Sequence, residues 1–308
     1  MNRIVVHEVG PRDGLQMEKQ VVPLETKEDW IRRAMAAGVD IVQVGSFVHP
    51  EKVPQMADTD ELFRRLTAQK TSATVLSGLV LNEKGLDRGL ACGVEMFCLG
   101  ASASETHSLK NTGMGSAEAT QRIVAAAQRA VAAGRKVQVS VQSAFGCGFE
   151  GPVPESRVLD MVRAYLDAGL TSVSLADTAG HAHPAQVERL FGAVLALGPG
   201  VECACHFHNT YGLGMANLFA AMRAGVTSFA GLGGCPFTKV AAGNVATEDF
   251  VHALQREGAR CDIALDRLID LARDVGAFFG RAMQGYVVHT GPIAYREPAH
   301  GGSHKESA

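Results

Sequence analysis

Short apolar runs alternate with amphipathic stretches along most of the chain. After a first run that begins at Ile4, further runs lie at residues 39–44, 74–80, 94–99, 137–141, 171–175, 201–206 and 226–229. Short, mainly apolar runs are typical of parallel strands that are covered on both faces. Between them, helical spacing of apolar residues marks residues 25–37, 83–91, 117–133, 154–168, 184–197 and 213–224. This pattern predicts an α/β fold with eight strands.

Glycine marks the end of most of the helical stretches. Gly38, Gly93, Gly134, Gly169 and Gly225 each follow a small residue and precede a β-rich run. Glycine in that place is the left-handed helix stop that short helix-to-strand loops favour. Eight such units in about 250 residues predict a (β/α)8 TIM barrel. A doubly wound open sheet is the alternative, but no G-x-G-x-x-G motif follows the first run.

The pattern also divides the chain into three parts. Residues 1–260 are expected to form the catalytic barrel. Residues 261–296 are expected to form a C-terminal helical extension, with an amphipathic helix at residues 265–279, that packs on the barrel. Residues 297–308 are polar and are expected to be a mobile tail.

Composition excludes several classes of protein. The chain has 308 residues, 46% of them apolar and 20% charged, and its net charge is −3, an ordinary balance for a soluble globular protein. It has no basic block that predicts a nucleic-acid surface, and no apolar run near the ~20 residues that span a membrane. The N-terminus lacks a signal peptide's apolar region, and seven scattered cysteines without C-x-x-C favour reduced thiols. We therefore expect a cytoplasmic protein.

His206 and His208 lie two residues apart at the end of the seventh apolar run. Side chains at i and i+2 of a strand point to the same face, so both imidazoles can bind one metal ion. The alternative is that they are hydrogen-bonding residues at a strand end. In a barrel, polar residues that follow different strands share one mouth, which is where barrel enzymes hold their active sites.

Other polar residues follow the remaining strands. They are Arg12 and Asp13 after the first strand, Gln43 and Ser46 at the second, Ser102, Ser104 and Glu105 after the fourth, Cys147 after the fifth, Asp177 and Thr178 after the sixth, and Cys235 and Asn244 after the eighth. Two imidazoles with one carboxylate form a mixed nitrogen and oxygen site, which suits Mg²⁺, Mn²⁺ or another divalent cation with open positions. Each of two motifs also has a purely structural explanation. Residues 11–14 could form a simple turn, and residues 231–236 could form a plain flexible loop.

Several motifs resemble one enzyme family. They are VGPRDGLQ at residues 9–16, SFVHP at 46–50, VPQMAD at 53–58, the H-x-H segment, GLGGCP at 231–236 and GNVATED at 243–249. Together, and in this order over residues 5–254, they resemble the 3-hydroxy-3-methylglutaryl-CoA (HMG-CoA) lyase branch of the metal-dependent lyase TIM barrels.

The resemblance implies a reaction and a set of site residues. The reaction is a retro-Claisen cleavage of HMG-CoA to acetyl-CoA and acetoacetate. The divalent cation, Mg²⁺ or Mn²⁺, would be held by Asp13, His206, His208 and Asn244; the catalytic residues would be Arg12, Asp13, His206 and Cys235, and the substrate-binding residues Arg12, Gln16, Gln43, Ser46, Ser102 and Thr178. Arg12 would polarise the thioester or the developing enolate oxygen, and Cys235 would lie on a mobile loop as an acid, or else pack in that loop. An acyl-CoA substrate and a homodimer are also implied.

Three positions depart from the family pattern. Gln43 replaces a glutamate, Asn209 stands where animal-type enzymes have aspartate, and Gly148 replaces a proline. Gln43 removes a negative charge near Arg12 but keeps hydrogen-bonding capacity. Because this changes the charge at the substrate-facing end of the barrel, the sequence does not determine which substituent the substrate carries at C3. Two alternatives remain: a related metal-dependent aldolase or condensing enzyme that acts on an α-keto acid, and a barrel that binds a metal or acyl-CoA without turnover.

Overall fold

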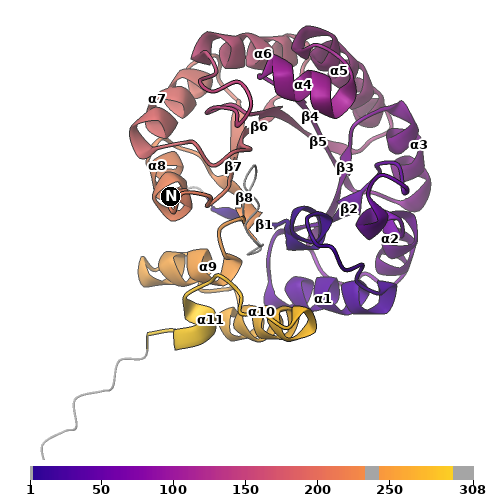
Figure 1. Ribbon diagram of the computed structural model, residues 1–308, viewed down its shortest axis with the longest axis vertical. Helices are drawn as coiled ribbons and strands as arrows, with labels where there is room; N and C mark the ends of the chain where they lie inside the picture. Colours follow the sequence, from indigo (N-terminus) through magenta and orange to yellow (C-terminus); the bar gives the residue numbers. More distant parts are fainter. Residues whose placement is uncertain (1–2, 233–242, 294–308) are drawn as a thin grey trace, which may run out of the picture.

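Eight parallel strands close into a barrel in the computed structural model, which describes residues 3–232 and 243–293 (Figure 1). The strands are β1 (Val5–Glu8), β2 (Ile41–Ser46), β3 (Val75–Val80), β4 (Met96–Ser102), β5 (Lys136–Gln142), β6 (Ser172–Asp177), β7 (Glu202–Phe207) and β8 (Ser228–Leu232). Each strand pairs with the next one in sequence, and β8 pairs with β1. The predicted (β/α)8 TIM barrel is therefore confirmed.

Helices surround the barrel. They are α1 (Leu24–Ala37), α2 (Thr59–Ala68), α3 (Glu83–Cys92), α4 (Glu105–Thr112), α5 (Ser116–Ala132), α6 (Glu155–Asp167), α7 (Pro184–Leu195), α8 (Gly214–Arg223), α9 (Thr247–Arg256), α10 (Leu265–Phe279) and α11 (Val287–Thr290). A π-turn, η1 (Gly10–Gly14), and a 3₁₀ turn, η2 (Pro54–Met56), precede α1 and α2. The sequence pattern did not single out α2, α4 or α9. For α4 the reason is physical, because Ser108 is its one fully buried residue. None of the described helices is long and apolar enough to cross a membrane.

The predicted glycine stops adopt the left-handed backbone that they require. Gly38 ends α1 with φ 95°, and Gly93 ends α3 with φ 89°. Gly134, Gly169 and Gly225, which follow α5, α6 and α8, also have positive φ. A residue with a Cβ is strained in this conformation, so glycine lets each helix end abruptly and the chain enter the next strand.

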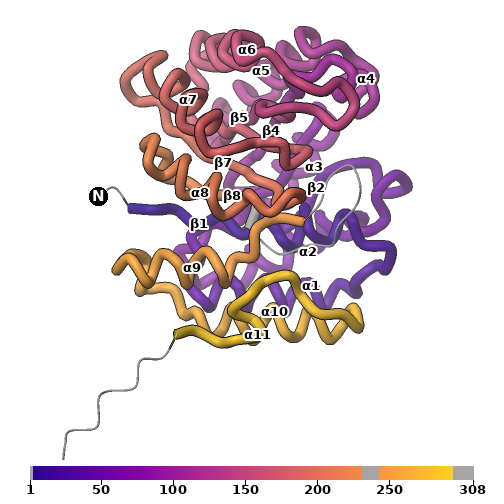
Figure 2. Tube along the Cα trace, turned by 60° about the vertical axis from the view of Figure 1, so that its left-hand side comes forward, coloured from indigo at the N-terminus to yellow at the C-terminus, as the bar shows by residue number. Residues whose placement is uncertain are grey.

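The helix α10 packs against α1 and α9 on one side of the barrel (Figure 2). Its inner face buries Leu268 and Ile269, and the Trp30 ring of α1 meets Phe278 edge-on with ring centroids 5.4 Å apart. The expected division of the chain at residue 260 stays a prediction. The tail predicted at residues 297–308 lies outside the described residues.

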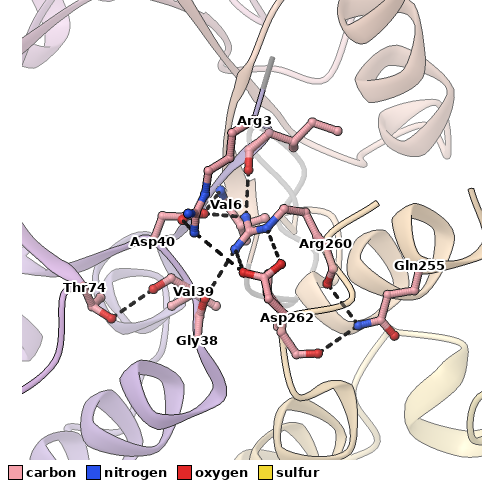
Figure 3. A network of polar contacts seen from close by, with 11 residues as sticks. Arg3, Val6, Gly38, Val39, Asp40, Thr74, Gln255, Arg260 and Asp262 are labelled. Carbon is pink, nitrogen blue, oxygen red and sulfur yellow. Dashed lines mark hydrogen bonds and ion pairs between the residues drawn. The ribbon is translucent and has the colours of Figure 1, made fainter. Parts of the chain in front are cut away.

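Arg260 ties three segments together at the end of the barrel where the strands begin (Figure 3). Its Nη1 donates to the carbonyl of Ile4 at 2.7 Å and to Asp40 Oδ2 at 2.5 Å, and its Nε donates to Asp262. Asp40 Oδ2 also accepts the backbone N–H of Val6. The guanidinium therefore joins the start of β1, the start of β2 and the segment before α10, far from the carboxyl ends of the strands.

We predict that Arg260→Met lowers the free energy of unfolding by roughly 3 kcal/mol, because it leaves buried oxygens without their donor. Arg3 is the matched control, since it also contacts Asp40 but its side chain is 69% exposed. Arg3→Met should cost less than about 1 kcal/mol. Urea denaturation of the three proteins measures both effects, and equal losses in the two variants would contradict the assignment.

Candidate active site

A cavity of about 320 Å³ lies at the carboxyl ends of the strands. Its wall includes many of the residues that the sequence pointed to, together with polar side chains from inside the barrel. Those of interest here are His7, Arg12, Asp13, Gln16, Gln43, His107, Gln138, Ser140, Gln142, Ser174, Thr178, His206, His208 and Asn244. This is the face on which TIM-barrel enzymes hold their active sites.

The turn η1 presents Arg12 and Asp13 to this cavity. The carbonyl of Val9 accepts the N–H groups of both residues, at 3.0 and 2.7 Å, which folds the chain back directly after β1. Arg12 Nη1 donates to Asp13 Oδ1 at 2.5 Å, and Arg12 Nε donates to Gln43 Oε1 at 2.5 Å. The amide oxygen of Gln43 therefore holds the guanidinium in place without adding a negative charge.

His206 and His208 converge at the end of β7. Their Nε2 atoms are 3.0 Å apart, and Asp13 Oδ2 lies 3.3 Å from Nε2 of His208 and 3.7 Å from Nε2 of His206. Nδ1 of His208 donates to the carbonyl of Thr178 at 2.9 Å. This hydrogen bond leaves the lone pair of the neutral ring on Nε2, the atom that faces Asp13 and His206.

Asn244, in the loop between β8 and α9, also belongs to the cluster. A single β-bridge pairs its backbone with that of His208, and its Nδ2 donates to Asp13 Oδ2 at 3.0 Å. Its other amide atom, Oδ1, is buried and has no hydrogen-bond partner among the described residues. Buried polar atoms normally have a partner, so this oxygen is a candidate ligand.

The cluster has the donor set of a divalent-cation site. The ligand atoms of Asp13, His206 and His208 all lie within 4.8 Å of one another. Two imidazole nitrogens and a carboxylate oxygen, with the amide oxygen of Asn244 beside them, suit a cation that binds nitrogen and oxygen together. The residues present therefore fit a bound metal ion.

The ionisation states of Asp13 and His206 favour metal binding. Burial raises the pKa of Asp13, but Arg12 and the two imidazoles outweigh burial and hold that pKa well below its usual value. Burial lowers the pKa of His206 to about 3, so the ring is neutral. Burial also acts to lower the pKa of His208, but the hydrogen bond to Asp13 raises it above the ordinary value, so cation binding at its Nε2 displaces a proton. An ionised carboxylate beside a neutral imidazole is what a cation requires, and Asp13 and His206 supply both.

The remaining predicted residues fall into two groups. Gln16, Gln43 and Thr178 line the cavity with Arg12. Ser46 and Ser102 do not: both are buried away from its wall, and Ser102 Oγ accepts the backbone N–H of Ser104. Cys235, the expected acid, lies outside the described residues.

Two other predicted residues have local roles. Ser104 is the N-cap of α4, where its hydroxyl accepts the N–H of His107. Asp177 accepts the backbone N–H groups of His181 and Ala182, which shapes the loop after β6. Asn209, one of the departures from the family pattern, accepts the N–H of Gly214 at 2.9 Å through its amide oxygen. An amide serves there as well as a carboxylate.

Sequence reasoning missed the polar interior of the barrel. Gln138, Ser140 and Gln142 alternate along β5 with valines, so they share the face that points to the barrel axis. Strand pairing places Ser140 beside Ser174, one layer beneath His206. The period of two was visible in the sequence and could have identified this face once the strand was assigned.

Fold and site together define a TIM-barrel enzyme with a candidate metal centre at the mouth of the barrel. A family model described as HMGL-like matches residues 3–275 of the chain. The chain belongs to this family.

The sequences and structures of individual relatives are also similar to this chain. Hydroxymethylglutaryl-CoA lyase of Bacillus subtilis is 34% identical over 91% of this chain and 95% of its own length, and (R)-citramalyl-CoA lyase of Chloroflexus aurantiacus is 36% identical over 95% and 96%. The solved HMG-CoA lyase of Acinetobacter baumannii, in complex with coenzyme A and 3-methylmalate, is 36% identical with a TM-score of 0.88, over 96% of this chain and 97% of that one. The predicted enzyme class, a carbon–carbon lyase, is confirmed.

We predict that His208→Ala abolishes retention of a divalent cation, because it removes an imidazole that lies between Asp13 and His206. The protein should stay folded, since the ring lies at the cavity wall rather than in the apolar core. Metal analysis of the desalted protein after loading with Mn²⁺, alongside circular dichroism, measures both. Full occupancy in a folded variant would refute the site.

Proposed function

We propose that this chain is a divalent-cation-dependent lyase that cleaves HMG-CoA, or a close 3-hydroxy-3-substituted acyl-CoA, to acetyl-CoA and a keto acid. The observation that carries the proposal is the convergence of Asp13, His206 and His208 beside the amide oxygen of Asn244, which has no hydrogen-bond partner among the described residues. The names of the relatives and the coenzyme A bound in the solved neighbour support an acyl-CoA substrate.

Asp13, His206, His208 and Asn244 would hold the cation, and Mg²⁺ or Mn²⁺ suits their donor set. When bound, such an ion supplies Lewis acidity toward the carboxylate and the tertiary hydroxyl of the substrate. The chain's own contribution is to fix these side chains. The carbonyl of Thr178 orients the His208 ring, and the amide of Asn244 orients Asp13.

Arg12 is suited to stabilise the leaving group. In the cleavage a base takes the proton of the C3 hydroxyl, C3 becomes a ketone, and the bond between C2 and C3 breaks. The electron pair of that bond passes to the enolate of acetyl-CoA, which then takes a proton at C2. The guanidinium of Arg12 is buried and held from two sides, by Asp13 and Gln43. A donor that is already in place stabilises developing negative charge without reorganisation. We assign the final protonation to Cys235, as the family resemblance implies.

Citramalyl-CoA is the second candidate substrate. Relatives act on acyl-CoA molecules with different C3 substituents, among them (R)-citramalyl-CoA and, in Pseudomonas aeruginosa, 3-hydroxy-3-isohexenylglutaryl-CoA. The part of the cavity wall formed by β5 and β6 is polar, with Gln138, Ser140 and Ser174, whereas Leu79 and Leu81 line another part. A long apolar arm against the polar part would leave these groups without partners, which costs free energy. The polar part therefore favours short polar arms, which both HMG-CoA and citramalyl-CoA carry.

Incubation with HMG-CoA, citramalyl-CoA and 3-hydroxy-3-isohexenylglutaryl-CoA, each with Mg²⁺ or Mn²⁺, tests the substrate class. We expect acetyl-CoA release from one or both short substrates and a kcat/KM at least tenfold lower for the isohexenyl compound, since one buried polar group without a partner costs about 1–3 kcal/mol. Acetoacetate or pyruvate identifies the substrate that is used. If no acyl-CoA releases acetyl-CoA with either metal, the proposed lyase activity is wrong, and condensation on an α-keto acid becomes the reaction to assay.

We predict that Arg12→Gln lowers kcat by about 10²- to 10³-fold, the usual effect of removing one preorganised donor. Mn²⁺ binding should change only a few-fold, because Arg12 is not a ligand. Arg223→Gln is the control: its exposed side chain pairs with Glu188 on the outer surface, and activity should be unchanged. A variant at Arg12 with the parental kcat would show that the guanidinium has no catalytic role.

A further inference from the structure

Glu8, the last residue of β1, connects two loops of the candidate site. Its Oε1 accepts the N–H of Gly10 at 2.6 Å, and its Oε2 accepts the hydroxyl of Thr247. Gly10 begins the turn η1, which carries Arg12 and Asp13. Thr247 begins α9 and follows Asn244 by three residues. One side chain thus binds both the first and the last loop of the barrel.

These contacts complete a ring that includes two of the candidate ligands. The ring runs from Asp13 to Asn244 through the amide hydrogen bond, along the chain to Thr247, across to Glu8, and through Gly10 back to Asp13. Glu8 is 7% exposed and Thr247 is 2% exposed, so both hydrogen bonds are shielded from bulk water. The two carboxylate oxygens of Glu8 and the hydroxyl of Thr247 are therefore engaged in contacts within the protein.

The hydroxyl of Thr247 has no other hydrogen bond among the described residues. Threonine near the start of a helix commonly accepts a backbone N–H as a cap. Here the N-cap is Ala246, which has no side-chain cap, and the Thr247 hydroxyl instead donates to Glu8, 239 positions earlier in the chain. The contact is specific in geometry, because a residue of the same shape without a hydroxyl would leave Oε2 of Glu8 without its donor.

We propose that Glu8 and Thr247 are positioning residues that hold Asp13 and Asn244 at the spacing that one cation requires. The proposal rests on the proposed function, because it assumes that these residues bind a cation. Neither Glu8 nor Thr247 lines the cavity of the candidate site, so they act through the loops that they connect. Groups that orient metal ligands typically change metal affinity 10- to 100-fold when they are removed.

Thr247→Val tests this directly, because it removes the hydroxyl and keeps the shape of the side chain. We expect the dissociation constant for Mn²⁺, measured on metal-stripped full-length protein by the EPR signal of free Mn²⁺, to rise about tenfold. Saturating Mn²⁺ should then restore most of kcat, since the site is loosened rather than lost. Thr247→Ser keeps the hydroxyl and should stay within about twofold of the parent.

Thr59 offers a matched control. It also begins a helix, α2, it is fully buried, and its hydroxyl makes one hydrogen bond, to the carbonyl of Met56 at 2.8 Å. Thr59→Val should lower the melting temperature by an amount similar to Thr247→Val, while its Mn²⁺ affinity stays within about twofold of the parent. Equal effects of the two valine variants on Mn²⁺ affinity would overturn the positioning role.

The pair can also be tested as a unit. If Glu8 and Thr247 act through one contact, the double variant Glu8→Ala/Thr247→Val should bind Mn²⁺ no more weakly than Glu8→Ala alone. Multiplied losses would overturn the coupling. A parent that does not take up Mn²⁺ refutes the cation site itself, whereas a parent that loses Mn²⁺ in His208→Ala but not in Thr247→Val refutes only this inference.

Discussion

The parallel pairing of β1 with β8 is the constraint on which the candidate site depends. It aligns Val5 with Ser228 and Val6 with Phe229, and the register shifts before Glu8 pairs with Leu232. Because all strands run the same way, the closure brings the loop after the first strand against the loop after the last one. Asp13 and Asn244, 231 positions apart, come within hydrogen-bond distance as a result. In an open sheet with these strands at opposite edges, the two residues would be far apart.

Neighbouring charges and burial then determine which side chains of the site are ionised. Asp13 stays ionised inside the protein because the charge of Arg12 and the hydrogen bond with His208 outweigh burial and keep the pKa of Asp13 low. Gln43 contributes a hydrogen bond to Arg12 but no charge, so Asp13 is the one carboxylate that contacts this guanidinium among the described residues. With a divalent cation bound, the site would be net positive, which favours a substrate that brings its own carboxylate. This argument agrees with the polar side chains of β5 and β6 in the cavity wall.

Much of the fold could be predicted from the sequence. The eight apolar runs and the glycine stops identified the barrel because each is a local property of the chain. The candidate ligands were named mainly through motifs that resemble a family, since nothing local links Asp13 to His208. Ser46 and Ser102, which the family resemblance implied as substrate-binding residues, do not line the cavity, because position near a strand end does not determine which way a side chain points.

The sequence by itself determined the pairing of His206 with His208, because a separation of two residues in a strand puts both side chains on one face whatever the rest of the fold. It also determined that the barrel would have eight strands with helices between them. Only the tertiary structure decided that the carbonyl of Thr178 would orient His208, that the amide of Asn244 would contact Asp13, and that Glu8 would reach Thr247. Periodicity encodes the face on which a side chain lies, whereas distances between loops depend on strand register and on closure of the barrel.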